Sequence, residues 1–268
     1  MIIVSFNVNS VRLRLPQIQA VIDKYAPEFI GLQETKAQDK DFPLQALNDM
    51  GYQAIYMGQK THYGVALLSK SSCIESQLGF PGDDEEAQKR FIGGHYRVND
   101  EDWYVYNGYF PQGEANDHPV KYPAKQKYYT DLNRFIGERH TTQQRVVVMG
   151  DYNIAPADND IGIGADNAKR WLKMGKTSFL PEEREWFESF CKLGYHDGFR
   201  HVHPDESELF SWFDYRSKGF EREPRRGLRI DHLLVSDVLI SDVTEAGIDY
   251  DIRAMEKPSD HAPVWIKL

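Results

Sequence analysis

The sequence predicts a mixed α/β fold formed by one domain, and three observations support this prediction. Short strand-like segments, rich in β-branched and aromatic residues, alternate with helical patterns along the whole chain. No low-complexity tract or long linker interrupts the alternation, so residues 1–268 are expected to form a single domain. The 268 residues, of which 41% are hydrophobic, suffice to bury a sizeable core.

Several segments have the composition of strands. Each is short and contains mainly β-branched or aromatic residues, and turn residues bound most of them. The predicted strands are residues 2–6, 29–33, 65–69, 103–109, 145–149 and 230–235.

Other segments are predicted to be helical. Residues 16–25 and 122–139 carry apolar side chains at the i, i+3, i+4, i+7 spacing of one helix face, so each is expected to cover a sheet. A third helix is expected to begin at Pro181, because proline lacks the N–H group that the first helical turn leaves unpaired. Glu182 and Glu183 would then face the positive end of the helix dipole.

Cysteine content and hydropathy indicate the cellular setting. The two cysteines, Cys73 and Cys191, are far apart and form no C-x-x-C pair, so neither a disulfide framework nor a structural zinc site is expected. No stretch approaches the ~20 apolar residues of a membrane span, and the first residues lack the basic start of a signal peptide. We therefore expect a cytoplasmic protein without membrane contact.

The charge is unevenly distributed along the chain. A formal net charge of −9 argues against a nucleic-acid-binding protein, because contacts to phosphates require Lys and Arg. The interval 216–229, however, holds six basic residues and two acidic ones, a local net charge of +4. This interval is either a solvated loop or a surface for a polyanion.

Polar residues that suit phosphate chemistry follow predicted strands. Asp151 and Asn153 come after residues 145–149, and an extended backbone points residues i and i+2 the same way. A carboxylate can bind a metal ion or transfer a proton, while a neutral amide donates to a phosphoryl oxygen. Asn7 and Asn9 repeat this spacing after the first strand.

Two further acids stand at strand ends. Glu34 follows residues 29–33, and Asp231 lies in the opening of the strand 230–235. Active sites of layered α/β folds gather at strand ends, although acids at these positions are also often solvated or paired.

Asp260 and His261 are neighbours in a segment between Pro258 and Pro263. Adjacent residues of a strand point to opposite faces, so these two can serve one site only from a loop or a strand end, which the prolines favour. The alternative is an ordinary surface loop.

The candidate ligands indicate which metal ion would bind. They are mainly oxygen atoms, without a Cys and His cluster, which favours Mg²⁺ or Mn²⁺ over zinc. No P-loop, G-x-G-x-x-G or G-x-S-x-G motif occurs, so nucleotide-cofactor and serine-hydrolase functions are not expected.

Ordered motifs of the chain resemble those of the exonuclease III family, and the intervening segments 63–66, 79–86 and 211–218 are similar to its bacterial branch specifically. The motifs are SFNVN (5–9), LQETK (32–36), NGYFPQG (107–113), GDYNIAP (150–156), GLRID (227–231) and SDHAP (259–263). The resemblance covers residues 2–265. Departures are small: Tyr152 stands where the family often has Met or Leu, His232 follows Asp231, and the loop 221–226 is slightly longer than usual.

The resemblance implies a four-layer α-β-β-α sandwich, in which two mixed sheets pack face to face between outer helices. It implies a Mg²⁺-dependent enzyme of DNA repair: a 3′→5′ exonuclease on duplex DNA, an endonuclease at abasic sites and a 3′-phosphatase. The expected partners are double-stranded, abasic and 3′-blocked DNA, and the protein is expected to act as a monomer.

The resemblance also implies a metal site. Glu34 would be the principal ligand of Mg²⁺, for which Mn²⁺ could substitute, with Asn7 and Asp260 nearby. Asp151 and Asn153 would offer a second metal position, and whether one ion or two bind stays open.

Catalytic roles follow from the same resemblance. Asp151 would act as the base for the attacking water or as the acid for the leaving 3′ oxygen. Asn153 and Tyr109 would contact the scissile phosphate. His261, oriented by Asp231, would stabilise the pentacovalent phosphorus centre, much as a carboxylate fixes an imidazole tautomer in other enzymes.

Basic, polar and aromatic residues complete the expected DNA interface. Trp212, Leu228 and Ile230 would form an apolar pocket for a sugar that lacks its base, with Phe213 beside it. The predicted DNA-binding residues are Arg90, Gln112, Lys121, Arg170, Lys176, Trp212, Phe213, Arg216, Lys218, Leu228 and Ile230.

Two other functions are compatible with the same residues. Another phosphodiesterase of the wider superfamily, such as a sphingomyelinase or an inositol-phosphate phosphatase, would share the metal and phosphate residues but not the basic interval. A DNA-binding protein that lost catalysis would keep the fold, but the complete set of acids together with His261 argues against it.

Overall fold

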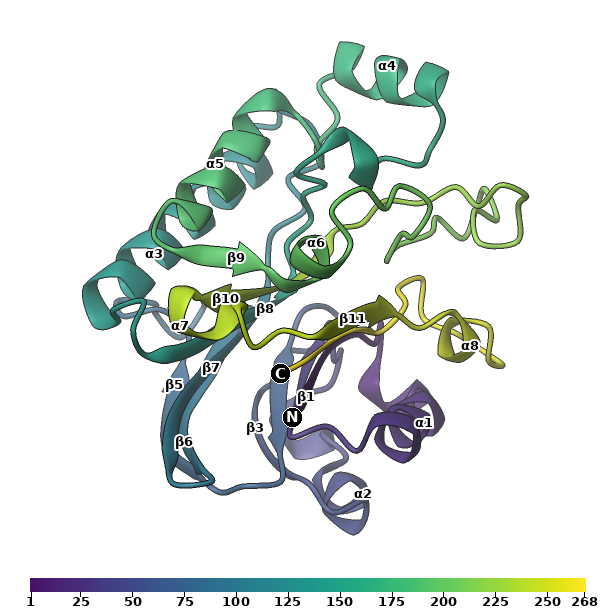
Figure 1. The fold of residues 1–268 in the computed structure, drawn as a ribbon. Helices are drawn as coiled ribbons and strands as arrows, with labels where there is room; N and C mark the ends of the chain where they lie inside the picture. The colour runs from purple at the N-terminus through teal and green to yellow at the C-terminus, as the bar shows by residue number, and fades with distance from the viewer.

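The computed structural model describes residues 1–268 and consists of two six-stranded sheets with helices around them (Figure 1). Sheet A has the strand order β11-β12-β1-β2-β4-β3, and sheet B has the order β5-β6-β7-β8-β10-β9. The strands are β1 (Ile2–Asn7), β2 (Phe29–Gln33), β3 (Gln53–Met57), β4 (Val65–Ser69), β5 (Cys73–Leu78), β6 (Phe91–Val98), β7 (Glu101–Tyr109), β8 (Arg145–Asp151), β9 (Tyr195–Asp197), β10 (Asp231–Ser236), β11 (Glu245–Ile248) and β12 (Val264–Lys267).

Each sheet is mixed. β1 pairs in parallel with β2, and β7 pairs in parallel with β8, whereas all other neighbouring strands are antiparallel. Because the strands of each parallel pair run in the same direction, their carboxyl ends lie together at one end of the sheet, and the polar residues of the sequence motifs stand there.

Helices cover the outer faces of the two sheets. The α-helices are α1 (Leu15–Tyr25), α2 (Leu44–Asp49), α3 (Lys121–Arg139), α4 (Ala165–Lys173), α5 (Pro181–Cys191), α6 (Gly198–Val202), α7 (Asp237–Ile240) and α8 (Tyr250–Arg253). α1 and α2 lie outside sheet A, and α3 and α5 lie outside sheet B (Figure 1). This order of layers confirms the predicted four-layer sandwich.

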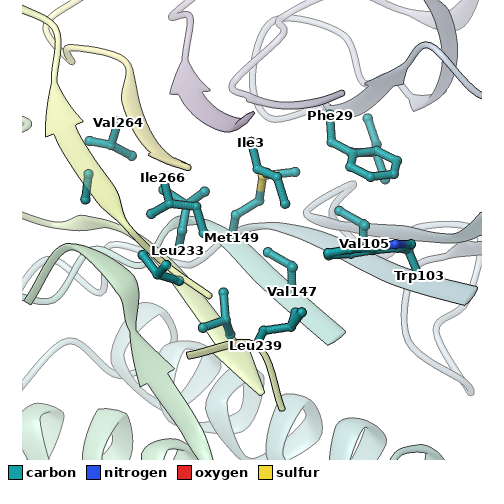
Figure 2. Packing of buried hydrophobic residues seen from close by; sticks show 14 of the residues in the cluster. Ile3, Phe29, Trp103, Val105, Val147, Met149, Leu233, Leu239, Val264 and Ile266 are labelled. Carbon is teal, nitrogen blue, oxygen red and sulfur yellow. The ribbon is translucent and has the colours of Figure 1, made fainter. Parts of the chain in front are cut away.

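The largest apolar cluster lies between the sheets. Ile3 and Phe29 of sheet A pack over Val105, Val147 and Met149 of sheet B, and all five side chains are shielded from solvent (Figure 2). Burying a large apolar side chain contributes ~1.5–3 kcal/mol, so this layer holds the sheets together. Two further clusters join each sheet to its helices.

All six predicted strands and all three predicted helices are present, with ends that differ by at most two residues. β8 continues to Asp151, beyond the predicted end, because Asp151 pairs with Tyr109 of β7 and Asp231 of β10. Six strands were not predicted, namely β3, β5, β6, β9, β11 and β12. None of the helices combines the length and the apolar character that crossing a membrane requires.

Candidate active site

The polar residues of the sequence motifs meet at one end of the sandwich. Asn7 ends β1, Glu34 follows β2, and Asp151 ends β8. The parallel pairing of β7 with β8 places Tyr109 beside Asp151, and the antiparallel pairing of β10 with β8 places Asp231 on its other side. Asp151 is therefore the central residue of the group.

Asn7 connects the two sheets at this site. Its Nδ2 donates to Glu34 Oε2 at 3.1 Å and to Asp151 Oδ2 at 3.0 Å. Lys36 Nζ lies 2.8 Å from Glu34 Oε1 and balances part of the negative charge. Glu34 has a φ of 56°, a left-handed conformation that costs a non-glycine residue ~1–3 kcal/mol. Its carbonyl oxygen accepts the N–H of Ser10 at 2.9 Å, so the surrounding loop holds this conformation in place.

His261 lies between two carboxylates. Its Nδ1 is 2.8 Å from Asp231 Oδ2, and its Nε2 is 3.8 Å from Asp151 Oδ2. Hydroxyl groups fix both partners of the first pair: Ser211 Oγ accepts the N–H of Asp231 at 3.0 Å, and Ser259 Oγ accepts the N–H of His261 at 3.2 Å. These contacts hold the imidazole in one position, with a carboxylate facing each ring nitrogen.

Burial and mutual charge shift the pKa values of these groups. Burial raises the pKa of Asp151 to about 7, and the Asp231 carboxylate adds to the rise, while the His261 imidazolium and Asn7 oppose it. Burial lowers the pKa of His261, but the carboxylates of Asp231 and Asp151 outweigh it and raise this pKa to about 10. At neutral pH His261 is therefore an imidazolium, and Asp151 can both give and take a proton.

Asp260 has partners of its own. Its Oδ1 accepts from Asn9 Nδ2 at 2.8 Å, and its Oδ2 accepts from Trp212 Nε1 at 3.1 Å. Lys36 Nζ donates to Asn9 Oδ1 at 2.6 Å and also contacts Glu34, so Asp260 connects to Glu34 through two intervening side chains.

Tyr109 is held by an arginine between two aromatic rings. The Arg90 guanidinium carbon lies 4.3 Å from the ring centroid of Tyr63 and 4.6 Å from that of Tyr109. Burial, followed by the charges of Glu34 and Asp151, raises the pKa of Tyr109 well above its ordinary value. The hydroxyl therefore stays protonated and can donate to a phosphate oxygen.

Asn153 has a left-handed backbone with a φ of 52°. Its N–H donates to Asp151 Oδ1 and its Nδ2 donates to the Phe110 carbonyl, both at 3.0 Å. Lys125 Nζ, fully buried on α3, donates to the Asn153 carbonyl at 2.9 Å and pairs with Glu183 at 2.5 Å. Lys125 is not among the functional residues that the sequence predicts, because lysines on helices usually face solvent. Its ion pair holds the main chain that carries Asn153.

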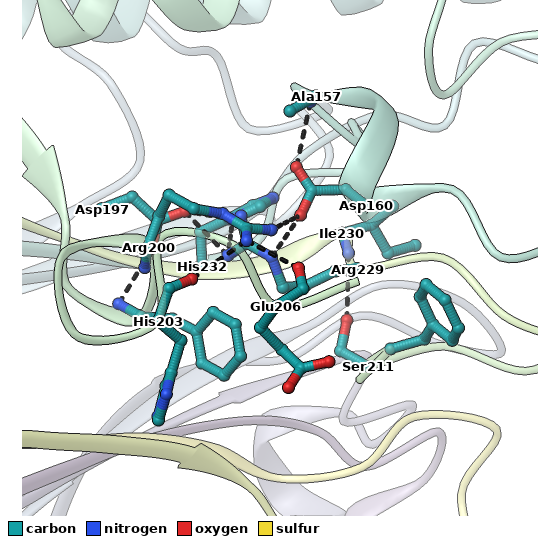
Figure 3. A network of polar contacts seen from close by, with 12 residues as sticks. Ala157, Asp160, Asp197, Arg200, His203, Glu206, Ser211, Arg229, Ile230 and His232 are labelled. Atoms are coloured by element: carbon teal, nitrogen blue, oxygen red, sulfur yellow. Dashed lines mark hydrogen bonds and ion pairs between the residues drawn. The ribbon is translucent and has the colours of Figure 1, made fainter. Parts of the chain in front are cut away.

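A second buried ionic group lies behind the start of β10 (Figure 3). Arg229 Nε donates to Asp160 Oδ1 at 2.6 Å, and its second nitrogen lies 2.7 Å from Asp197 Oδ2. Arg229 also donates to His232 Nδ1 at 3.0 Å. Because Nδ1 accepts, the proton of this ring is on Nε2, which donates to the Ile154 carbonyl at 2.9 Å. Arg229 belongs to the basic interval 216–229, but it is only 1% exposed, which leaves five basic side chains of this interval at the surface.

The predicted DNA-binding residues divide into two groups. Those with exposed or half-buried side chains are Arg90, Gln112, Lys121, Arg170, Lys176, Trp212, Arg216 and Lys218. Phe213, Leu228 and Ile230 are 0%, 1% and 3% exposed, so the structure does not bring these side chains to the surface. Phe213 packs against Phe220 and Tyr250 instead. Of the predicted apolar pocket, only Trp212 is accessible, and the buried residues support it from behind.

The residues of the site fit a divalent cation. Carboxylate oxygens of Glu34 and Asp151 converge on Asn7, and such oxygen atoms are the ligands that Mg²⁺ and Mn²⁺ prefer. Asp151 and Asp231 lie close together beside His261, with atoms of the three side chains within 4.8 Å of one another, but the charged imidazolium has no lone pair for a cation and only the carboxylates could bind one. Asp231 Oδ1 is buried without a hydrogen-bond partner, which leaves an oxygen free for a ligand.

Two stacked sheets that carry carboxylates, neutral amides and a charged histidine at one end define a hydrolase of phosphate esters. Residues 4–261 match the endonuclease/exonuclease/phosphatase family. The chain is 51% identical to exodeoxyribonuclease III of Haemophilus influenzae over 262 residues, which make up 98% of this chain and 97% of that relative. The chain therefore belongs to the endonuclease/exonuclease/phosphatase family, in the branch of exodeoxyribonuclease III.

Solved structures agree with this assignment. A 3′ phosphatase from Neisseria, bound to a product DNA hairpin, is 37% identical with a TM-score of 0.89, over 100% of this chain and 99% of that one. An AP endonuclease from Archaeoglobus fulgidus is 28% identical with a TM-score of 0.88, over 99% of this chain and 98% of that one.

Proposed function

We propose that residues 1–268 form one catalytic domain, a metal-dependent DNA-repair nuclease. It would remove nucleotides from the 3′ ends of duplex DNA, cleave at abasic sites and remove 3′-phosphates. One observation carries the proposal: the buried Asp151 carboxylate, with a pKa raised to about 7, lies between the Asn7–Glu34 pair and the Asp231–His261 pair. A proton-transfer group, a fixed positive charge and oxygen ligands for a cation therefore meet in one place.

The chain's own side chains supply most of the proposed chemistry. Asp151 takes a proton from the attacking water or gives one to the leaving 3′ oxygen. The His261 imidazolium donates to the phosphate oxygens, whose negative charge grows as the phosphorus becomes pentacovalent. Asn153 and Tyr109 add neutral donors to the same oxygens, and Asp231 keeps the imidazole oriented and charged.

Mg²⁺ is the proposed cofactor, with Mn²⁺ as a substitute. Glu34 and Asp151 would hold the ion beside Asn7, with Asp260 nearby, and Asp151 with Asn153 remains the candidate second position. When bound, such an ion neutralises phosphate charge and acidifies a bound water.

Duplex DNA, including abasic and 3′-blocked DNA, is the proposed substrate. The exposed cations Arg216 and Lys218 suit a phosphate backbone, and the names of the relatives favour DNA over a sphingolipid or an inositol phosphate. A monomer in the cytoplasm is part of the proposal and rests on the sequence alone.

The first prediction tests the function itself. Purified protein is expected to cleave duplex DNA with one abasic site when Mg²⁺ is present and to stop when EDTA removes the ion. Sphingomyelin and inositol phosphates, incubated in parallel, should stay intact. Cleavage that persists in EDTA would disprove the metal dependence. Hydrolysis of the other esters alone would indicate another phosphodiesterase, and DNA binding without cleavage would indicate a protein that has lost catalysis.

The second prediction concerns Trp212. Trp212→Ala is expected to lower cleavage at abasic sites by at least about tenfold, ~1.4 kcal/mol in activation free energy. A sugar without a base is extruded without the unstacking cost of ~a few kcal/mol, and the half-buried indole offers it an apolar wall. Hydrolysis of a simple phosphodiester should change little.

A matched variant separates the two contacts of Trp212. Trp212→Phe keeps an aromatic wall but loses the N–H that donates to Asp260 at 3.1 Å. It should therefore retain most of the abasic-site activity. Equal losses by Trp212→Ala on the abasic DNA and on the simple ester would show that Trp212 supports the whole site and does not select the substrate.

A further inference from the structure

A hollow of about 240 Å³ lies beside the candidate active site, between α4 and the loop 213–226. α4 and this yellow-green loop project from the same side of the molecule (Figure 1). We call this cavity the basic hollow, because its lining includes Arg170, Lys176, Arg222, Arg226, Trp171 and Trp212. Trp212 is shared with the active site, since its indole N–H donates to Asp260.

The cations of the basic hollow are not neutralised within the chain. None of the four forms an ion pair: Arg170 donates to Asn167 Oδ1 and Arg222 donates to the Ser217 carbonyl, both at 2.9 Å. Lys176 Nζ lies over the Trp171 ring at 5.1 Å. The one acidic side chain in the lining, Asp214, accepts the main-chain N–H groups of its own turn. An excess of positive charge therefore surrounds the cavity.

The loop 221–226 supplies two of the four cations, Arg222 and Arg226. The N–H of Arg226 donates to the Gly219 carbonyl at 2.8 Å, which closes the loop on itself. The Arg226 guanidinium carbon lies 3.8 Å from the point where a side chain on Gly164 would begin, at the start of α4. The loop thus brings Arg222 and Arg226 across to Arg170 of α4.

We propose that the basic hollow is a phosphate subsite, distinct from the scissile-phosphate position, that holds a backbone phosphodiester of the bound DNA. The inference rests on the proposed function and names a second point of contact for the same substrate. A cavity of about 240 Å³ is smaller than the ~300–1,000 Å³ of pockets that enclose a drug-sized ligand, and it has room for a phosphate group of a larger molecule.

Both the charge and the position of the basic hollow suit a ligand with repeated phosphate groups. Trp212 forms a wall of both sites, so a ligand with repeated phosphate groups can occupy both at once. Arginine recognises phosphate oxygens with two parallel N–H groups, and three of the four cations are arginines. The subsite therefore adds affinity without reading the base sequence.

The third prediction compares two neighbouring arginines of the loop. Arg226 lines the basic hollow, whereas Arg225 stacks on Phe220 and Tyr250 at 5.0 and 4.8 Å and does not line it. Arg225→Gln and Arg226→Gln each remove one positive charge from adjacent positions. Binding of a duplex is measured in EDTA over a range of salt concentrations. Arg226→Gln should lower the log–log salt slope by roughly 0.9, the loss of one phosphate contact, and Arg225→Gln should leave it unchanged.

A neutral phosphate analogue locates the contact on the DNA. Duplexes that carry one methylphosphonate at successive positions are expected to reveal a position, away from the scissile phosphate, where wild-type affinity falls. The same analogue should cause a smaller loss with Arg226→Gln than with Arg225→Gln, because one of the four cations that line the basic hollow is absent in Arg226→Gln. Arg222→Gln should behave like Arg226→Gln.

Several outcomes would overturn the subsite. Equal slopes for Arg225→Gln and Arg226→Gln would reduce the basic hollow to general surface charge, and a methylphosphonate effect of equal size in the two variants would place the contact elsewhere. Each variant is also assayed with Mg²⁺ on a simple phosphodiester. This small substrate does not reach the basic hollow, so each variant should hydrolyse it at the wild-type rate. Failure of the wild-type protein to cleave abasic DNA would count against the proposed function. The binding comparison in EDTA does not depend on cleavage and would still test the phosphate subsite.

Discussion

Asp151→Asn is expected to lower the single-turnover rate of DNA cleavage by roughly 10²–10⁴-fold while DNA binding stays near the wild-type level. An amide keeps the shape of the side chain and can still accept the Asn153 N–H, which lies 3.0 Å from Asp151 Oδ1, but its NH₂ group cannot replace Oδ2 as the acceptor for Asn7 Nδ2. It cannot take up or release the proton. The measurement is rapid-mixing cleavage of abasic DNA beside a filter-binding assay of the same complex.

The stability of this variant provides its control. Burial raises the pKa of Asp151, so the ionised carboxylate is disfavoured in the folded protein, and a neutral isostere removes that cost. The lost hydrogen bond from Asn7 opposes this gain, so the midpoint of thermal unfolding above pH 7 should change little. A nearly normal cleavage rate would rule out Asp151 as the acid or the base, and a large fall in the unfolding midpoint would mean that lost structure explains the lost activity.

Local patterns predicted much of the site. Asn7, Glu34, Asp151 and Asn153 were identified because each stands at or just after a predicted strand, and strand ends can be read from composition and period-2 geometry. The pairing of strands is a long-range property. Only the structure shows that Asp231 lies opposite Asp151 in the register of β10 with β8.

Two of the strands that the sequence did not predict, β5 and β6, have compositions that are unusual for strands. β6 contains Gly93 and Gly94, residues that are rare in strands. A Cβ on Gly93 would lie 2.1 Å from the Tyr106 ring, and one on Gly94 would lie 2.7 Å from Cys73 Sγ, so close packing requires glycine at both positions. β5 is largely exposed and polar, which conceals it from a search for apolar alternation.

The burial of charged side chains could not be predicted from the sequence either. Lys125 and Glu183 are 58 residues apart, and each has the composition of a solvated helix surface when considered alone. Both side chains are fully buried, because each neutralises the other and their remaining hydrogen bonds go to main-chain groups. Such pairs become visible only when the fold places the two helices together.

His261→Ala is expected to reduce the single-turnover rate by roughly 10²–10³-fold, because the charged donor to the phosphate oxygens is lost. Asp231→Asn should be milder and should act through pH. It keeps an acceptor for His261 Nδ1 but removes a negative charge that raises the pKa of His261 to about 10, so this pKa falls toward its ordinary value of 6.5.

The direction of the pH effect of Asp231→Asn follows from which form of His261 is active. A group that works in its protonated form loses function as the pH rises through its pKa, so the rate of the variant relative to wild type should fall steadily from pH 6 to pH 9. Asp237 forms a comparable but exposed pair with His196 at 2.7 Å, and Asp237→Asn is the matched control that should leave the profile unchanged. A constant ratio for Asp231→Asn across this range would show that Asp231 orients the imidazole without setting its charge.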